Sequence, residues 1–285
     1  MEEKVYMIGY KAFKPGLVCD PDGNRFQYAE NTVFEMEESP VVCKIGFHFC
    51  KYPMDVLDYY PLINSDGTMN EFAQVEALDD CVTDDDTKYS TKKIRIGAKF
   101  GLKELVHAAV TFDYTSNKRK DVEVLAKELD YAQMASSGDY AQMAASGYSA
   151  QMASSGYSAK MASSGDSAQM ASSGDYAQMA ASGDYAKMAS SGYYAQMASS
   201  GYSAKMASSG DYAQMSSSGE NAVVMCAGND SKAKAKKGSW ITLSEWDYVN
   251  DKYTPVFVKT ERVDGERIKE DTWYKLRGGE FVEVE

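Results

Sequence analysis

The stretch GDYAQMAASGYSAQMASSG, residues 138–156, holds two copies of a nine-residue repeat. Glycine recurs every nine residues from Gly138 to Gly228, and methionine keeps the same interval from Met134 to Met215. A further copy from residue 219 to 227 keeps the alanine but has Val224 at the methionine position. A strict period of this length predicts a solenoid, because each copy stacks on its neighbours and buries the same side chains.

Each copy fits one short strand and one turn better than a helix. The eight residues between glycines are too few for a stable isolated helix. In residues 140–144, strand alternation directs Ala141 and Met143 to one side and Gln142 to the other. The Ser-Ser-Gly-Asp stretch then turns the chain, and glycine is expected to supply a positive φ there. Two copies make one coil of 18 residues around a narrow core of methionine and alanine.

The predicted fold is mainly β. A parallel β-solenoid with two nine-residue repeats per coil is expected over residues 129–228, about 26 Å long at roughly 4.8 Å per coil. An α+β domain at residues 1–116 precedes it, with a short, polar, helical linker or cap at 117–128. A small β-rich capping domain follows at 229–285, with a Gly-Gly hairpin near its end. The lysine run at 232–237 is interpreted as a charged end that stops the stacking.

Tyrosine recurs at the second and third positions of the repeat, where the turns lie. Tyrosine is enriched at protein interfaces, but stacked rings along a solenoid edge also stabilise neighbouring coils. The sequence leaves both roles open. The predicted protein-binding residues are Tyr140, Tyr148, Tyr157, Tyr176, Tyr185, Tyr193, Tyr194, Tyr202 and Tyr212.

No metal site and no cofactor are predicted. Calcium-binding nine-residue repeats carry two glycines and an aspartate per copy, whereas this repeat lacks the second glycine and has tyrosine in place of the aspartate at 148, 157, 193 and 202. Zinc ligands could come from Cys19, Cys43, His48 and Cys50. These residues lack a Cys-x-x-Cys pair, so buried free thiols are the preferred interpretation.

Charge and composition narrow the classes of partner. The net charge of −12 argues against non-specific binding to nucleic acid or to an anionic membrane. No apolar run reaches the roughly 18 residues needed to span a bilayer, and the start of the chain is not typical of a signal peptide. The five cysteines are irregularly spaced, which does not favour a disulfide framework. We therefore expect a cytoplasmic protein.

The N-terminal domain is the place where catalytic residues would lie. Strands are expected at residues 6–13, 72–78 and 93–98, with a short helix after Pro53.

The segment GFHF at residues 46–49, followed by Tyr60, resembles the Gly-x-Tyr-Phe…Tyr segment of ADP-ribosyltransferases. That resemblance implies Tyr10, His48 and Glu76 as the catalytic residues of an alternative, enzymatic interpretation. The early His or Arg and the Ser-Thr-Ser strand of those enzymes are absent.

Most of the chain also resembles a family of uncharacterised phage and prophage proteins, which have an α+β domain followed by Ala/Ser/Gly-rich nonapeptide repeats. The resemblance rests on YKAF at 10–13, GFHFC at 46–50, the repeats themselves and VDGERIKEDTWY at 263–274. It implies a phage-encoded protein that acts in the cytoplasm of a bacterial host. The repeats are similar as well to the solenoid heads of trimeric autotransporter adhesins, whose repeats are longer.

The leading functional hypothesis is a non-catalytic protein that inhibits a host antiviral-defence component by binding it. One alternative is a structural or assembly protein of the virion, and another is an ADP-ribosyltransferase-like enzyme in the N-terminal domain. The expected partners are a host protein and, because a solenoid has open edges, a second copy of the chain. Membranes and nucleic acid are not expected as partners.

Overall fold

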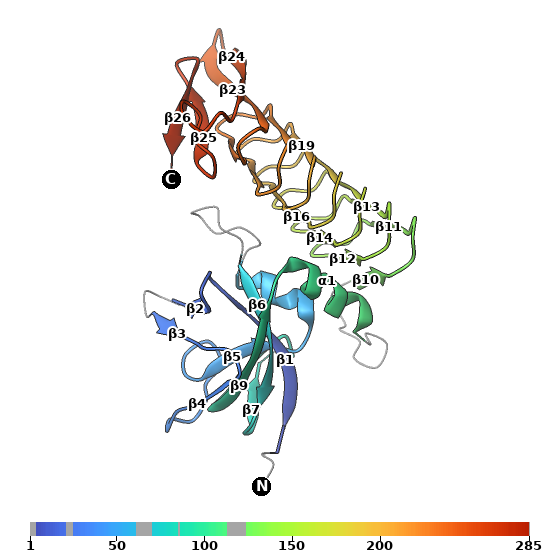
Figure 1. The fold of residues 1–285 in the computed structure, drawn as a ribbon, viewed down its shortest axis with the longest axis vertical. Helices are drawn as coiled ribbons and strands as arrows, with labels where there is room; N and C mark the ends of the chain where they lie inside the picture. Colours follow the sequence, from blue (N-terminus) through green and yellow to red (C-terminus); the bar gives the residue numbers. More distant parts are fainter. Residues whose placement is uncertain (1–3, 21–24, 61–69, 85, 113–123, 285) are drawn as a thin grey trace. The chain divides into compact units, whose positions relative to one another are not determined.

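The protein is described here from a computed structural model, in residues 4–20, 25–60, 70–84, 86–112 and 124–284. The described residues up to 112 form one compact unit, and those from 124 onward form a second. The first unit is an antiparallel sheet with two short helices, and the second is a solenoid with a β cap (Figure 1).

Seven strands of the first unit form one sheet, in the order β4-β9-β6-β1-β5-β8-β7. The three strands expected from the sequence are confirmed, and the expected helix after Pro53 is a 3-10 helix. The elements are β1 (Met7–Phe13), β2 (Val18–Cys19), β3 (Phe26–Gln27), β4 (Thr32–Glu35), β5 (Phe47–Cys50), η2 (Pro53–Asp58), β6 (Glu71–Ala77), β7 (Cys81–Thr83), β8 (Lys88–Thr91), β9 (Lys93–Phe100) and α1 (Leu102–Thr111).

Helix α1 was not expected from the sequence, although the signals for it are present. Its apolar residues Leu102, Leu105, Val106 and Ala109 follow helical spacing, and all four are buried. The Glu104 carboxylate accepts the N–H of the N-cap residue, Gly101, at 3.1 Å. This contact satisfies a backbone donor at the start of the helix.

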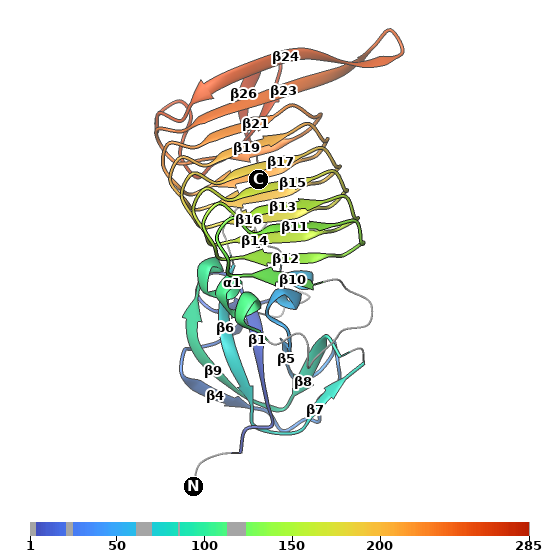
Figure 2. The ribbon, with the colours of Figure 1, turned by 90° about the vertical axis from the view of Figure 1, so that its right-hand side faces the viewer.

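The second unit confirms the predicted parallel β-solenoid. Its strands alternate between two sheets, named here sheet I and sheet II, and Figure 2 shows the strands of each sheet stacked above one another. Sheet I contains β10 (Val124–Lys127), β12 (Gln142–Ala145), β14 (Lys160–Ser163), β16 (Gln178–Ala181), β18 (Gln196–Ser199), β20 (Gln214–Ser217), β22 (Lys232–Lys234), β25 (Trp273–Arg277) and β26 (Glu280–Val284). Sheet II contains β11 (Gln133–Ser136), β13 (Gln151–Ser154), β15 (Gln169–Ser172), β17 (Lys187–Ser190), β19 (Lys205–Ser208), β21 (Val223–Cys226), β23 (Trp240–Val249) and β24 (Lys252–Arg262).

The core of the solenoid is a stack of methionines. Each repeat strand pairs in parallel with the strand 18 residues later, so Met143 lies opposite Met161, and Met161 lies opposite Met179. All three side chains are fully buried. The expected coil of two repeats is therefore confirmed, and the flexible thioether side chains fill the space between the sheets.

The repeat glycines serve close packing rather than a positive φ. None of them is among the glycines with positive φ, so the expected conformational role was wrong. A Cβ atom built on Gly156 would lie 2.0 Å from the carbonyl oxygen of Gly138 in the preceding coil. The later repeat glycines meet the same obstacle. Only a residue without a side chain lets successive turns approach this closely.

The positive φ falls instead on the third residue of each repeat. Tyr140 and Tyr176 have φ of 58° and 57°, and Ser149 and Ser167 have 54° and 58°. This conformation is unfavourable for a bulky residue. It is held in place because the same residue donates its N–H to the next coil, as Tyr140 does to the carbonyl of Tyr157 at 2.7 Å.

We expect Gly156→Ala to lower the free energy of unfolding by more than about 2 kcal/mol, because the new methyl group would collide with the Gly138 carbonyl oxygen of the preceding coil. Ser155→Ala is the matched control, since this exposed neighbour should change stability by less than about 0.5 kcal/mol. Urea denaturation followed by circular dichroism measures both. Equal stabilities of the two variants would contradict the proposed role of the glycine.

The stack extends beyond the predicted ends. Residues 124–127 form strand β10, which pairs in parallel with β12, so the helical cap expected at 117–128 is wrong here; residues 117–123 lie outside the described residues. The lysine run does not stop the stack, because Lys232–Lys234 form β22 in parallel with β20. Ala233 takes the buried methionine position, and the ammonium groups of Lys232 and Lys234 lie 4.8 and 5.4 Å from the centre of the Trp273 ring.

A β cap closes the last coil. Val263, Ile268, Tyr274 and Leu276 are buried in the same cluster as the methionines, so they fill the open end of the core. The predicted Gly-Gly hairpin between β25 and β26 is confirmed, with positive φ at both glycines.

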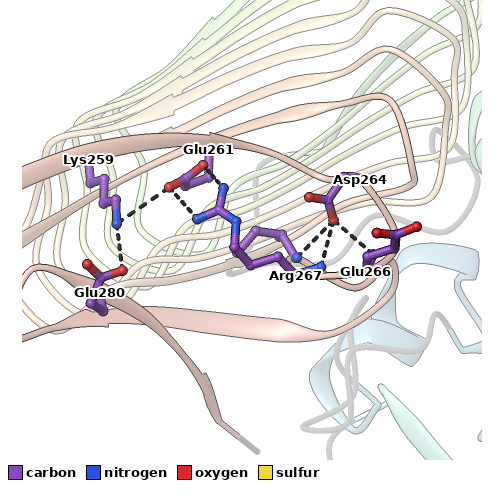
Figure 3. Close-up of polar contacts among 7 residues, drawn as sticks. Lys259, Glu261, Asp264, Glu266, Arg267 and Glu280 are labelled. Atoms are coloured by element: carbon purple, nitrogen blue, oxygen red, sulfur yellow. Dashed lines mark hydrogen bonds and ion pairs between the residues drawn. The ribbon is translucent and has the colours of Figure 1, made fainter.

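Ion pairs join β24 to the rest of the cap (Figure 3). Lys259 contacts Glu280 of β26 at 2.6 Å and Glu261 at 3.5 Å. Arg267 makes a forked pair with the same Glu261 carboxylate. The Asp264 carboxylate accepts three backbone N–H groups of the loop that follows it. These contacts hold the cap loops in one geometry.

Candidate functional site

Five tyrosines stack along one corner of the solenoid, where the chain passes from sheet II to sheet I. The ring centroids of successive members lie 5.9, 5.2, 5.1 and 4.8 Å apart. The exposed fraction of each side chain lies between 37% and 53%, so the rings pack on one another and still face solvent. We call this set the five-tyrosine ladder; its members are Tyr140, Tyr157, Tyr176, Tyr194 and Tyr212.

The opposite corner holds two separate tyrosine pairs. Tyr131 and Tyr148 are 5.8 Å apart, and Tyr185 and Tyr202 are 5.9 Å apart. The coil between these pairs has no tyrosine at this corner, so no continuous ladder forms there. Tyr193 lies at the ladder corner and is 51% exposed, but among the described residues it belongs to no ring pair. The predicted binding tyrosines are thus divided between two unlike corners.

The aspartates that follow glycine hold the coils together. Each carboxylate accepts the backbone N–H of the residue 18 positions later, as Asp139 does from Tyr157 at 2.9 Å and Asp175 from Tyr193 at 2.8 Å. The same contact recurs at both corners. In the described part of the chain, no three His, Cys, Asp or Glu side chains are grouped so that they could hold a metal ion.

The outer face of sheet II is flat and accessible. Its outward alanines, such as Ala153 and Ala189, are exposed beside a row of glutamines and lysines that includes Lys187 and Lys205. A shallow groove of about 820 Å³ follows this row. A second groove runs over the alanines and serines toward the corner of the ladder. The second groove ends at the serines that precede the ladder corner, and a further groove joins Lys187 and Lys205 to Tyr148 and Tyr185 of the opposite corner.

The alternative catalytic residues are only partly brought together. Tyr10 and His48 line one pocket of about 270 Å³ in the first unit. Glu76 does not line it; its carboxylate pairs with Arg95 on the neighbouring strand β9. Tyr10, His48 and Glu76 follow one another along the chain in the order that the ADP-ribosyltransferase resemblance implies. The glutamate, however, is paired with Arg95 and does not line the pocket.

The same pocket contains a charged residue that the sequence reasoning did not select. Lys11 is only 8% exposed and lines the pocket beside His48. In the sequence, Lys11 lies between the aromatic residues Tyr10 and Phe13 in an apolar strand, and this position could have indicated that its side chain is buried. Charged residues are rarely buried without a partner.

Residues 7–108 match one family model, described as Domain of unknown function (DUF7666). The match covers the sheet unit and stops before the repeats. No curated protein and no solved structure matched the chain. The helices in the described part of the chain all lack the length and apolar content needed to cross a bilayer.

Ring stacking predicts that Tyr176 and Tyr193, which lie at the same corner, contribute differently to the free energy of unfolding. Tyr176→Ser removes the central ring of the ladder and should lower the free energy of unfolding by about 1–2 kcal/mol, because two ring contacts are lost. Tyr193→Ser is the control and should cost less than about 0.5 kcal/mol. Serine occupies the backbone position of Tyr176 in other copies, and Tyr193 is not among the residues with positive φ, so neither change should disturb the turn. Thermal or urea unfolding that fails to separate the two variants would contradict the stacking contribution.

His48 predicts a pH dependence of stability. Burial, followed by the charges of Lys11 and Lys88, lowers the pKa of His48 from 6.5 to about 4. Between these values the unfolded chain binds a proton that the folded chain does not, so stability should fall as the pH falls from about 6.5 to about 4. His48→Gln removes this dependence. Urea unfolding at pH 7 and pH 4.5 checks it, and parallel losses in both proteins would refute it.

Proposed function

We propose that this protein is a non-catalytic binding protein whose solenoid holds a protein partner along the five-tyrosine ladder and the adjacent face of sheet II. The observation that carries the proposal is the exposure of five stacked tyrosines in one line. Tyrosine contributes a large contact area with little side-chain entropy to lose, which is why it is frequent at binding hot spots.

The rigidity of the solenoid supports this function. Each tyrosine is fixed by a backbone hydrogen bond between coils and by its ring neighbours, so little order has to be created on binding. Four steps of roughly 4.8 Å give a ladder of about 19 Å, which suits an extended edge of a partner protein. The small, exposed alanine side chains on the outer face of sheet II allow the backbone or a flat surface of a partner to approach closely.

The proposed partner is a component of host antiviral defence, in the cytoplasm of a bacterium. The support for this step is the resemblance to phage and prophage proteins in the motifs quoted above. Occupation of a host protein by a rigid surface requires no catalytic residue. A role in virion assembly is the alternative use of the same surface.

An enzymatic function in the first unit is the second candidate. The observation in its favour is the meeting of Tyr10 and His48 in one pocket. The position of Glu76, paired with Arg95 on another strand, makes it the weaker candidate. Glu76→Gln would abolish activity if the glutamate were catalytic.

The test compares two sets of Tyr→Ser substitutions, one at each corner, in affinity capture from bacterial lysate and in phage plating on defence-carrying hosts. The ladder variant carries Tyr→Ser at Tyr140, Tyr176, Tyr194 and Tyr212, and the control carries Tyr→Ser at Tyr131 and Tyr185 of the opposite corner. We expect the ladder variant to bind a stoichiometric host protein at least tenfold more weakly and to lose protection of the phage.

The control should keep both properties. Serine holds the same position at 149, 158, 167 and 203, so both variants should keep the turn, and circular dichroism measures whether each is folded under the assay conditions. Unchanged capture and plating with the ladder variant would reject the ladder as the binding surface. Recovery of the protein in purified virions instead would move the function to assembly.

A further inference from the structure

The sheet of the first unit is partly split beside Lys11. Strand β1 pairs with β6 along its whole length, but its pairing with β5 is limited to Tyr10 opposite Cys50. Past this point the Lys11 side chain takes over the link, since its Nζ donates to the His48 carbonyl oxygen of β5 at 2.6 Å. The pocket of about 270 Å³ lies at this split.

Lys11 is a buried cation without an acidic partner. Its Nζ lies 5.2 Å from the centre of the Tyr28 ring and 5.6 Å from that of Phe13. No carboxylate of the described residues forms an ion pair with it. Burial lowers the pKa of Lys11, but Tyr28 and the thiols of Cys19 and Cys50 more than offset this effect. A buried ammonium group of this kind is costly unless an anion neutralises it.

A second lysine and an unsatisfied histidine face the same space. Lys88 lines the pocket, with its Nζ 4.2 Å from the centre of the Tyr59 ring. The Nε2 atom of His48 is buried and has no hydrogen-bond partner among the described residues. Among the described residues no aspartate or glutamate lines the pocket, although Asp55 and Asp58 of the adjacent helix η2 act electrostatically on Cys50 in its wall. The two lysines are therefore the charged side chains that line the described part of the pocket.

The walls of the pocket are aromatic. Phe26 and Tyr28 have ring centroids 4.6 Å apart, and Phe26 and Phe47 are 5.9 Å apart. The volume is near the lower end of the range for small-molecule sites, which sets the size of the ligand at about that of one or two rings with a substituent. Flat apolar walls around a few polar groups are typical of such sites.

We propose that this pocket binds a small planar organic anion, whose carboxylate or phosphate group pairs with Lys11 and Lys88 and whose ring lies against Phe26, Tyr28 and Phe47. The Nε2 atom of His48 is placed to accept a hydrogen bond from a hydroxyl or amino substituent, where the ligand carries one. This function belongs to the first unit alone and does not depend on the partner proposed for the solenoid.

Isothermal titration calorimetry on the full chain tests the proposal with two anions, benzoate and adenosine monophosphate, and their neutral counterparts, benzyl alcohol and adenosine. We expect saturable binding of at least one anion and at least tenfold weaker binding of its neutral counterpart. The anion that binds more tightly identifies the acidic group as carboxylate or phosphate. Absence of binding by both anions at about 10 mM would overturn the proposal, as would equal affinity for a neutral counterpart.

Substitutions locate the site. Lys11→Met and Lys88→Met should each weaken binding of the anion at least tenfold, because each removes one of the two charges. Lys44→Met is the control, since this exposed lysine of the same unit does not line the pocket. Lys88 is less buried than Lys11, so Lys88→Met decides the question if Lys11→Met fails to fold. Full affinity in Lys88→Met would show that Lys88 does not contact the anion and would overturn the proposed pair of lysines.

Discussion

The distance between successive turns is the constraint on which the solenoid depends. At every repeat glycine from Gly156 to Gly228, a Cβ atom would lie 1.9–2.2 Å from a carbonyl oxygen of the preceding coil. A side chain there would force the coils beyond the roughly 4.8 Å spacing that strand hydrogen bonds require. The methionine stack, the aspartate hydrogen bonds and the tyrosine ring contacts all join coils at this spacing. A wider spacing would therefore lengthen all three kinds of contact at once.

The same spacing explains how an unfavourable turn becomes a regular surface. The third residue of each copy has positive φ although it is never glycine, and its N–H is used by the neighbouring coil. Four of the five ladder tyrosines occupy this position and Tyr157 occupies the one before it, so the rings stack at the corner while remaining exposed. The turn between the strands thus also places aromatic rings in a regular line on the surface.

The first unit has no repeat, and its candidate site depends on a local break in strand pairing. Its chemistry is concentrated at an irregularity, where β1 and β5 separate and Lys11 replaces a backbone link. Burial of this ammonium group among aromatic rings, without a carboxylate, creates a positive site in an acidic protein. Burial and the two lysines also keep His48 neutral, because they lower its pKa to about 4.

The sequence by itself determined the period, the parallel strands, the methionine core and two copies per coil, because each follows from local alternation and exact repetition. Tertiary structure decided the role of the repeat glycines, since the obstructing carbonyl belongs to another coil. It also decided that Lys232–Lys234 extend the stack, because only stacking shows Ala233 in the methionine position. The meeting of Tyr10, Lys11 and His48 without Glu76 depends on strand order, which nonrepetitive segments do not encode locally.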